Sequence, residues 1–389
     1  MAERKRAGIS FWRTISHVDL TTVLSLLILA ALSYASILGA HTGGGEAWKQ
    51  LLWFLLGLGV LFATVFLDDT FVYRVSYFLY VVDLFLLVLL LFTGPKSEGV
   101  SRVLMSFTLP GGIAFQPSEF MKVFASLVFA RWFVEREEKG SPPRSVVDLI
   151  PLFALWGVPF ILIAIEPDLG DAIVLTVLFT SILFVALERK LLVKVFLLGG
   201  LAIGGIAGLY FFAPQVFFKI VKEYQWRRIT AFLQEPTFPA SDEQFQLVNS
   251  LLAIGSGGVW GKGWLSEINL TYNHWVPEAH TDFVFSVYGE SFGFVGAAFL
   301  LLVYFLFFYR VVQMSLEMEK PFARYTTAGF LGMFVFQVFE NIGMTVGIMP
   351  ITGITLPFLS YGGSSLVANF FAVGLILGFY IRRKRLSFV

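Results

Sequence analysis

One acid, Asp282, separates a polar, turn-forming stretch from a long apolar run in "WVPEAHTDFVF" (275–285). Glu278 and His280 precede it, and Glu290 follows on the apolar side. A general base requires a carboxylate that is partly shielded from water and whose pKa is tuned by neighbouring charges. An acid at a helix start is also the ordinary partner of the helix dipole. Asp282 is therefore a candidate catalytic base, with helix capping as the alternative.

A second pair of ionisable residues, Glu119 and Lys122, lies in "FQPSEFMKVF". The spacing i, i+3 places both on one face of a helix, and Pro117 suits its first turn. A charge buried in a membrane helix costs about 2.5–3.5 kcal/mol on insertion scales, so such residues usually pair and face a cavity. The pair is interpreted as a structural tie between helices or as the floor of a headgroup site. If the two residues pair, exchanging them is expected to restore part of what either single substitution removes.

Two further acids and several cations complete the candidate binding residues. Asp168 follows Pro167 at a predicted helix start and Asp171 lies one turn on, where the helix dipole favours acids. Guanidinium groups grip phosphate in bidentate fashion, so an anionic ligand such as a diphosphate is plausible for the cations on this side of the chain: Arg102, Arg227, Arg228 and Lys262.

Two Gly-rich stretches, "IGSGGVWGKGW" (254–264) and "SYGGSS" (360–365), do not match a P-loop. The second, with Ser360 and Ser364, precedes a predicted helix whose first N–H groups suit an anion. Close backbone turns are the alternative for both stretches. Glu340 and Asn341 are placed deep within another predicted helix, where Asn341 suits contacts between helices and Glu340 is predicted to pair with Lys122.

The chain offers little for metal or thiol chemistry. It contains no Cys, which excludes disulfides and thiolate zinc sites, and its four His are scattered through the sequence. A histidine metal cluster is therefore not expected, whereas a carboxylate-bound Mg²⁺ stays open.

The composition is that of a polytopic membrane protein. Of the 389 residues, 57% are hydrophobic and only 14% charged, against about 25% charged in soluble domains. A net charge of +1 gives no indication of nucleic-acid binding. The basic N-terminus is followed by an apolar span without a small-residue cleavage site, which is typical of a retained first helix.

Hydropathy predicts a single membrane domain, residues 1–389, of the all-α class with ten helices. The fifth and sixth are short and separated by "EPDLG" (166–170), as one re-entrant pair or two tilted spans. The predicted ranges are 19–40, 48–67, 70–92, 115–134, 148–165, 170–187, 191–212, 282–309, 323–347 and 363–381.

Lys and Arg in the short loops predict the orientation, because they favour the cytoplasmic side. With ten spans, every basic short loop and both basic tails fall on one face, whereas 41–47 and 348–362 contain no Lys or Arg. Both termini are therefore predicted to be cytoplasmic. The long loop 213–281 then lies outside the cell, and its stretch 217–233 is predicted to form an amphipathic helix at the interface.

This orientation restricts the chemistry. There is no nucleotide supply outside the cell, so an enzyme working there needs a donor activated in advance and delivered by a lipid. A polyprenyl-diphosphate sugar fits, because its tail stays in the bilayer while its diphosphate meets the Arg and Lys side chains. A carboxylate at the rim can then deprotonate an acceptor hydroxyl.

The motifs "FQPSEFMK", "EPDLG", "IGSGGVWGKGW", "VPEAHTDFVF" and "NIGMTVGIMPITGITLPFLSYGGSS" resemble, in the same order, those of the SEDS family (shape, elongation, division and sporulation). The resemblance covers nearly the whole chain, and the last two motifs are long and specific. "KEYQWRRITAFLQEP" and the short tails favour the elongation members of the family over its division members.

The resemblance implies a ten-span fold in the bacterial cytoplasmic membrane and polymerisation of lipid II into glycan strands, with release of undecaprenyl diphosphate. It assigns the essential acid to Asp282 and binding roles to Glu119, Lys122 and Asp168. It implies a class B penicillin-binding protein as partner and a preference for a divalent cation, Mg²⁺ or Mn²⁺.

Some positions depart from the family pattern. Val103 replaces a usual Trp, and Asp171 replaces a small or hydroxyl residue. After "WGKGW", the stretch "LSEINLTYNHW" replaces the common Gly- and Gln-bearing stretch. These departures concern contacts on the acceptor side. A flippase for the lipid-linked precursor, a division polymerase and a non-catalytic scaffold are the alternative functions.

Overall fold

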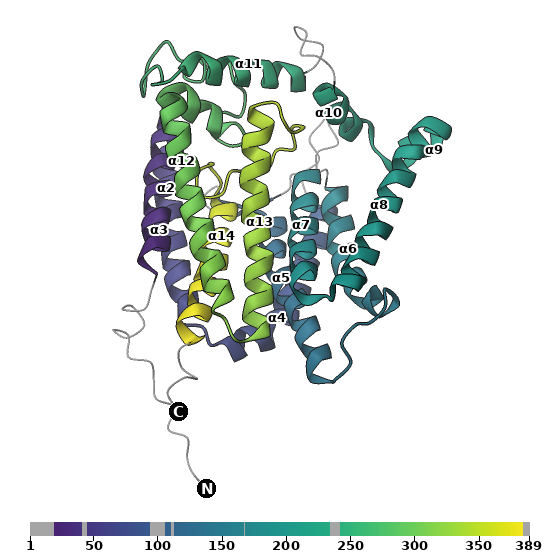
Figure 1. Ribbon diagram of the computed structural model, residues 1–389. Helices are drawn as coiled ribbons and strands as arrows, with labels where there is room; N and C mark the ends of the chain where they lie inside the picture. The colour runs from purple at the N-terminus through teal and green to yellow at the C-terminus, as the bar shows by residue number, and fades with distance from the viewer. Residues whose placement is uncertain are drawn as a thin grey trace.

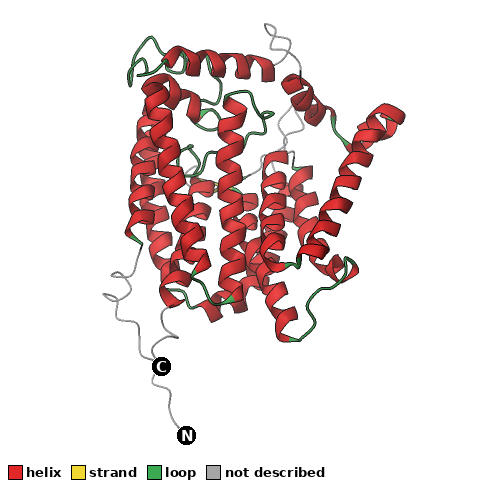
Figure 2. Cartoon of the chain, viewed as in Figure 1, coloured by secondary structure: helices red, strands yellow, loops and turns green. Residues whose placement is uncertain are grey.

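The computed structural model describes residues 19–40, 45–93, 106–109, 113–166, 168–233 and 242–383, and most of them are helical (Figure 2). Each of the ten predicted helices is present, with ends that differ by a few residues, so the all-α membrane fold is confirmed. Their bounds are α2 (Leu20–Gly39), α3 (Gly45–Val65), α4 (Asp69–Thr93), α5 (Pro117–Glu138), α6 (Ile150–Ile165), α7 (Leu169–Ala186), α8 (Arg189–Phe212), α12 (Val284–Leu316), α13 (Pro321–Thr345) and α14 (Gly363–Arg383).

Eight of these ten helices are long and apolar enough to cross a membrane, and α5 and α13 are the other two. Both occupy the middle of the bundle: α5 packs on α4, α7, α13 and α14, and α13 packs on α5, α7 and α12. Most of their side chains are buried against protein. Because polar groups on these two helices meet other side chains and not lipid, the helices need less apolar sequence.

The break at 166–170 separates two segments of spanning length and composition, which pack against each other: α7, and α6 together with the 3-10 turn Val147–Leu149 before it. Asp168 begins α7 as its N-cap, and its side chain accepts a hydrogen bond from the Asp171 N–H. The arrangement therefore favours two spans over a re-entrant pair.

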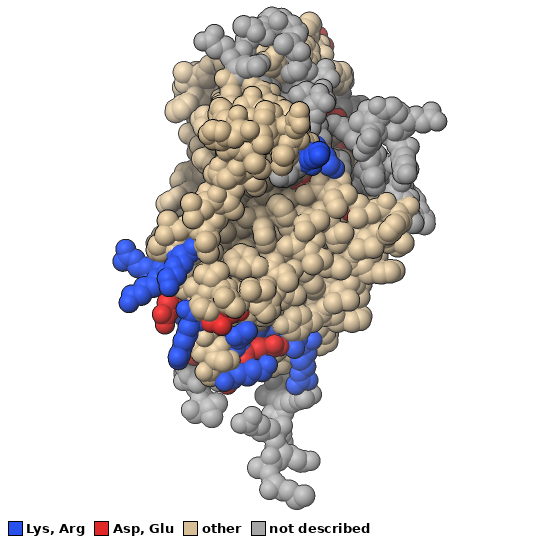
Figure 3. Space-filling view, turned by 90° about the vertical axis from the view of Figure 1, so that its right-hand side faces the viewer, with Lys and Arg blue, Asp and Glu red and all other residues tan. Residues whose placement is uncertain are grey.

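Ionic contacts concentrate at one end of the bundle, where charged side chains border an uncharged band (Figure 3). Asp69, at the start of α4, pairs with Lys320 (2.7 Å) and Arg382, and Asp19, before α2, pairs with Arg310. The starts of α2, α4 and α13 and the last turns of α12 and α14 thus meet here, which we call the basic end.

The opposite end carries the connecting segments. The short helices α9 (Pro214–Ile220) and α10 (Glu223–Leu233) follow α8, which leans away from the bundle, and α11 (Asp242–Gly257) lies across the tops of the helices (Figure 1). Helix α10 falls within the stretch for which an amphipathic helix is predicted. A small antiparallel hairpin of β1 (Phe107–Leu109) and β2 (Ile113–Phe115) was not predicted.

Helix α12 is interrupted at Gly293, whose φ of 65° lies in the left-handed region. The interruption frees backbone groups, and the segment after α11 satisfies them. Phe294 N–H and Val295 N–H donate to the carbonyls of Gly258 (2.9 Å) and Val259 (3.1 Å). In return, the carbonyls of Glu290 and Ser291 accept hydrogen bonds from the N–H groups of residues 262 (2.9 Å) and 263 (3.2 Å). Non-helical backbone is thereby tolerated at this depth.

Candidate active site

Residues 349–362, which we call the buried loop, fold back into the bundle and carry much of the site. The carbonyls of Pro357 and Leu359 accept hydrogen bonds from Tyr304 (2.6 Å) and Ser33 (2.7 Å). Ser360 Oγ donates to the Thr281 carbonyl at 2.6 Å. Because its polar backbone groups find partners on several helices, the loop forms a rigid wall of the site.

Asp282 lies in the turn before α12, against this wall. Asn341 Nδ2 on α13 donates to the Asp282 carbonyl and to the Ile354 carbonyl of the buried loop, both at 2.7 Å. Gly353 is exposed and has a φ of 79°, and a Cβ built on it would lie 3.4 Å from Asp282 Oδ2. The glycine therefore leaves free space directly beside the carboxylate, which is itself partly exposed.

The surroundings of Asp282 favour its protonated form. Burial and then the negative charge of Glu278 raise the pKa of Asp282 to about 7, while the positive charge of Arg228 opposes the shift. A carboxyl with a pKa near neutrality both accepts and releases a proton readily at physiological pH. This location supports the interpretation of Asp282 as a base more than a capping role, since the N-cap of α12 is Phe283.

The structure corrects the prediction for Glu340. It lies about one turn from the C-terminal end of α13 and not deep within it, and Lys122 does not contact it. Its Oε1 accepts a hydrogen bond from Thr352 Oγ1, and the negative charge of Asp282 acts on it. The Thr352 carbonyl accepts a hydrogen bond from Arg228 Nη1 at 3.0 Å. Thr352 thus joins a second carboxylate and a guanidinium beside Asp282.

Lys122 lies instead in a cluster of its own beneath the buried loop. Its ammonium is 2.8 Å from Glu119 Oε2 and 2.7 Å from Asp171 Oδ1, and all three side chains are buried. The predicted i, i+3 pair is therefore present on α5, with Asp171 of α7 as an additional partner. Such burial is tolerated only because the charges compensate one another.

Hydrogen bonds extend this cluster toward the start of α14. Ser118 Oγ donates to Asp171 Oδ2 at 2.7 Å, and Gln116 Nε2 donates to Asp168 Oδ2 at 3.2 Å. The Gln116 N–H donates to Ser364 Oγ at 3.0 Å, and Ser364 donates to the Ala114 carbonyl at 2.8 Å. The predicted binding residues Asp168 and Ser364 thus lie in one hydrogen-bonded set with Glu119 and Lys122.

The buried loop contacts elements that carry both groups of acids. A Cβ built on Gly170, next to Asp171 on α7, would lie 3.1 Å from the Thr352 carbonyl. The neighbouring Gly353 borders Asp282. The start of α7, which carries Asp171, therefore packs against the segment that shapes the space around Asp282.

Two ionisable residues considered with Asp282 in the sequence, Lys262 and Glu290, lie away from it. Lys262 Nζ pairs with Glu290 Oε1 at 2.7 Å, and the Glu290 side chain is fully buried. Glu290 also accepts hydrogen bonds from the Leu270 N–H (2.7 Å) and the Thr271 N–H (3.0 Å). Lys262 and Glu290 therefore organise the α11–α12 connection and are not a free cation and a free acid beside Asp282.

The other predicted residues have mixed outcomes. The carbonyl of His280 accepts a hydrogen bond from the Tyr361 N–H at 2.9 Å, which fixes the turn before Asp282 to the buried loop. Ser360 is bonded on both sides, since its Oγ also accepts from the Leu356 N–H at 2.8 Å. Arg228 is at the site, whereas Arg102 and the side chain of Arg227 lie outside the described residues.

A further pair of acids, Asp83 on α4 and Glu166 after α6, was not predicted from the sequence. Both are buried, and the charge of Glu166 acts on Asp83. Among the described parts of the chain, neither oxygen of Glu166 nor Oδ2 of Asp83 has a hydrogen-bond partner. Asp83 is a single acid within an apolar stretch, so no sequence spacing indicates that Glu166 lies near it.

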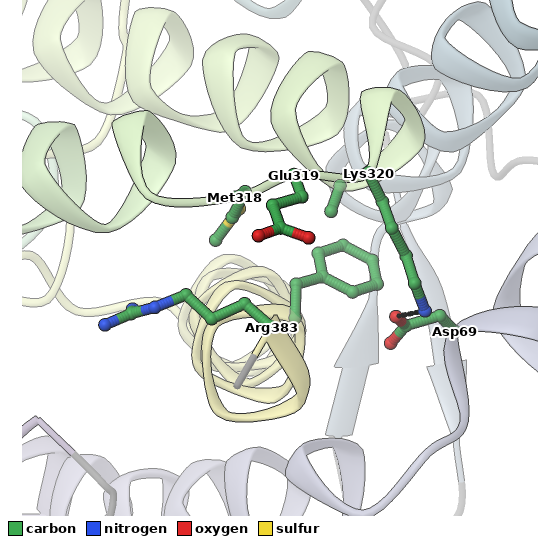
Figure 4. Close-up of a pocket in the computed structure, with 7 residues that line it drawn as sticks. Asp69, Met318, Glu319, Lys320 and Arg383 are labelled. Atoms are coloured by element: carbon green, nitrogen blue, oxygen red, sulfur yellow. Dashed lines mark hydrogen bonds and ion pairs between the residues drawn. The ribbon is translucent and has the colours of Figure 1, made fainter. Parts of the chain in front are cut away.

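A small pocket lies at the basic end, far along the bundle from Asp282. Figure 4 shows the Lys320–Asp69 ion pair on one side of it and Met318, Glu319 and Arg383 around it. Lys320 and Asp69 in its lining are paired with each other, and the pocket lies at the opposite end of the bundle from Asp282, so it is not part of the candidate site.

Known proteins resemble this chain over nearly its full length. The family model described as "Cell cycle protein", for FtsW, RodA and SpoVE, matches residues 11–385. Peptidoglycan glycosyltransferase MrdB of Escherichia coli (strain K12) is 31% identical over 382 residues, which cover 97% of each chain. Stage V sporulation protein E of Bacillus subtilis is 31% identical over 368 residues, which cover 92% of this chain and 96% of the relative.

Solved structures share the fold. A chain of a peptidoglycan synthase complex, described as coordinating polymerization and crosslinking, gives a TM-score of 0.74 at 29% identity and covers 95% of this chain and 99% of that one. The rod shape determining protein RodA of Thermus thermophilus gives a TM-score of 0.66 at 29% identity, covering 95% and 98%. From the family match and these relatives, the chain belongs to the SEDS family, which includes FtsW, RodA and SpoVE.

Proposed function

We propose that this protein is a peptidoglycan glycosyltransferase that joins lipid II units into glycan strands on the outer face of the cytoplasmic membrane. The observation that carries the proposal is Asp282: a partly exposed carboxylate with a pKa of about 7, beside free space at Gly353 and within the field of Arg228. The names of MrdB and FtsW relatives support the same chemistry.

In the proposed reaction, Asp282 takes the proton of the 4-hydroxyl of the GlcNAc unit of the acceptor lipid II. The hydroxyl oxygen attacks C1 of the terminal MurNAc of the growing strand. The new C1–O4 bond forms as the bond from C1 to the diphosphate oxygen breaks, and its electron pair leaves with undecaprenyl diphosphate. Attack from the face opposite the leaving group inverts the configuration at C1.

Arg228 is the described cation best placed for the departing diphosphate. Its Nη1 donates a hydrogen bond to the Thr352 carbonyl, and the guanidinium has further N–H donors that suit phosphate oxygens. Preorganised charge at a leaving group lowers the barrier more than the same charge in water does. Arg102 and Arg227 are proposed to add to this field, whereas Lys262 is not, because Glu290 holds it.

A divalent cation enters this proposal only with the substrate. Within the described ranges, no group of three or more His, Cys, Asp or Glu side chains is arranged to hold a metal ion. The two acids that contact Lys122, Glu119 and Asp171, are already paired with its ammonium, so they do not fit a resident Mg²⁺ or Mn²⁺ ion. An ion bound to the lipid diphosphate would supply charge neutralisation there.

We assign the outer face from the charge distribution. The basic end fits the cytoplasmic side by the positive-inside tendency, which places Asp282 at the opposite, outer end. A flippase is not favoured, since Glu340, the one acid predicted deep in the membrane, lies beside Asp282. An elongation role is favoured by the full-length match to MrdB and by the likeness to RodA.

We further propose a class B penicillin-binding protein as partner. The support is the likeness to a chain of a synthase complex that coordinates polymerization with crosslinking. Crosslinking requires a transpeptidase, and we propose that the partner supplies it.

Purified protein incubated with labelled lipid II, alone and with a cognate transpeptidase, tests the proposal. Glycan strands resolved on a gel are expected from the parent chain, with Asp282→Asn as the matched inactive control. A purified and folded parent chain that makes no strands under either condition would overturn the enzymatic proposal in favour of a flippase or a scaffold. Complementation of RodA-depleted and FtsW-depleted cells separates elongation from division.

A further inference from the structure

The connection between α11 and α12 exposes a run of large apolar side chains that no part of the mechanism uses. Trp260 is 79% exposed and Ile268 is 70% exposed. We call the set the aromatic rim, and its members are Val259, Trp260, Trp264, Leu265 and Ile268.

The rim continues the lipid-facing surface of α12. The hydrogen bonds of Gly258 and Val259 to Phe294 and Val295 place the start of the rim alongside the helix, just beyond the interruption at Gly293. Phe294 is itself 70% exposed, and exposed apolar residues continue down α12 toward the basic end. Because the exposed side chains of the aromatic rim and of the adjoining part of α12 are both apolar and lie side by side, we expect both to face lipid.

The depth of the rim follows from two independent helices. From Arg310 at the basic end to Gly293, α12 rises about 26 Å at about 1.5 Å per residue, and α2 rises about 23 Å from Leu20 to Ala35. Trp264 Nε1 donates to the Ala35 carbonyl at 2.7 Å, so this indole lies at that height. A hydrocarbon core of about 30 Å therefore ends within about a turn of the rim.

The charges next to the rim are compatible with this depth. Lys262 lies within the rim sequence, but its ammonium is paired with the buried Glu290. The backbone of the same segment is satisfied by Glu290, Ser291, Phe294 and Val295. Indole rings with one polar N–H are favoured at the boundary between hydrocarbon and headgroups.

We propose that the aromatic rim is an interfacial anchor that inserts its side chains into the outer edge of the hydrocarbon layer. The partner is the lipid surface itself, and not a second protein. The anchor fixes the height of the α11–α12 connection above the bilayer, and with it the turn that carries Asp282. The inference does not depend on the proposed catalytic activity.

Because the chain contains no Cys, single-cysteine variants can be spin-labelled without background. The full chain is reconstituted in vesicles of phosphatidylethanolamine and phosphatidylglycerol, with labels at Trp260→Cys and Ile268→Cys. Phe294→Cys is the lipid-facing control, and Lys139→Cys, in the exposed turn after α5, is the aqueous control. Collisions with oxygen report lipid, and collisions with a water-soluble nickel chelate report water.

The oxygen-to-nickel collision ratio at 260 and 268 is expected to match that at 294 and to exceed that at 139 several-fold. A ratio like that at 139 would overturn the proposal, and so would low collision rates with both reagents, which indicate a protein cover. Where a labelled chain does not fold, Trp260→Phe is compared with the parent for fluorescence quenching by brominated lipid. The variant should lose part of the quenching, and unchanged quenching would contradict the anchor.

Discussion

The two groups of acids that flank the buried loop differ in how completely their charges are satisfied. Beneath the loop, Lys122 contacts Glu119 and Asp171 at 2.8 and 2.7 Å, and water has almost no access. Above it, Asp282 has no ion pair among the described residues, is partly exposed and borders free space at Gly353. A compensated cluster holds structure, whereas an acid without an ion pair can exchange a proton more readily.

The two groups of acids therefore have separate roles. The cluster on α5 and α7 positions the loop, and the loop positions the space around Asp282. Substitutions beneath the loop should therefore act mainly on folding, and those above it mainly on rate.

The largest expected effect is the loss of catalytic rate caused by the substitution Asp282→Asn. An amide cannot accept the acceptor proton, so glycan synthesis should fall by about 10²–10⁴-fold, the usual contribution of a general base. The melting temperature should stay close to that of the parent, because no ion pair is lost. Strand synthesis at the parental rate would remove Asp282 from the role of base.

The next effect is on stability and concerns Lys122→Met. Removing the ammonium leaves Glu119 and Asp171 buried without compensation, which typically costs about 3–5 kcal/mol. Thermal unfolding in detergent should show a large fall in melting temperature, at matched expression. A variant as stable as the parent would show that the cluster does not hold the bundle together.

Exchanging the pair sharpens this point. With Glu119 and Lys122 alone, the exchange would be expected to restore part of the loss. Asp171 on α7 contacts the side chain at position 122. In the double variant Glu119→Lys/Lys122→Glu, the new glutamate at position 122 would therefore lie against Asp171, and the two negative charges would repel each other. Its melting temperature is expected to be no higher than that of Lys122→Met. Clear rescue by the exchange would mean that Asp171 is not a true partner.

A smaller effect on rate is expected from Gly353→Ala. The new methyl group would lie 3.4 Å from Asp282 Oδ2 and so crowd the acceptor hydroxyl, and a left-handed φ costs an alanine about 1–2 kcal/mol. Gly347→Ala is the matched control, because Gly347 also has a positive φ (75°) but borders Leu247 and Leu251 instead. Both variants should lose similar stability, and only Gly353→Ala should lose turnover beyond that. Equal turnover in the two would place the substrate elsewhere.

The smallest effect is on pH dependence. The ionised base prevails above its pKa, so the rate should rise with pH through about 7. The charge of Glu278 raises the pKa of Asp282, so Glu278→Gln should move this rise to lower pH. Glu267→Gln, which removes another exposed acid of the same connection, should leave the profile in place. A profile unmoved by Glu278→Gln would show that another group sets the rise.

Much of the fold was predictable, because membrane spans are encoded locally. A run such as Leu20–Gly39 must satisfy its own backbone in lipid, so its hydropathy alone predicts a helix. The pairing of Glu119 with Lys122 is likewise local, since both lie on one helix face. Helices α5 and α13 were predicted as well, although their burial inside the bundle leaves them less apolar than the others.

Contacts between distant segments were not predictable. Nothing near Lys122 in the sequence points to Asp171, and nothing near Glu340 points to Thr352 beside Asp282. The pairing of Lys262 with Glu290 depends on how the connection before α12 folds against the interruption at Gly293. In each case the partner is selected by packing between helices, which single-sequence patterns do not record.

The ion pairs at the basic end have a mechanical consequence. They tie the first turns of α2 and α4 to the last turns of α12 and α14, whereas most of α8 at the edge of the bundle has no helix packed against it. Helices fastened at one end and loose at the other separate by pivoting about the fastened end. Any sideways opening between the helices should therefore widen toward the end of the bundle that carries Asp282, while the basic end stays closed.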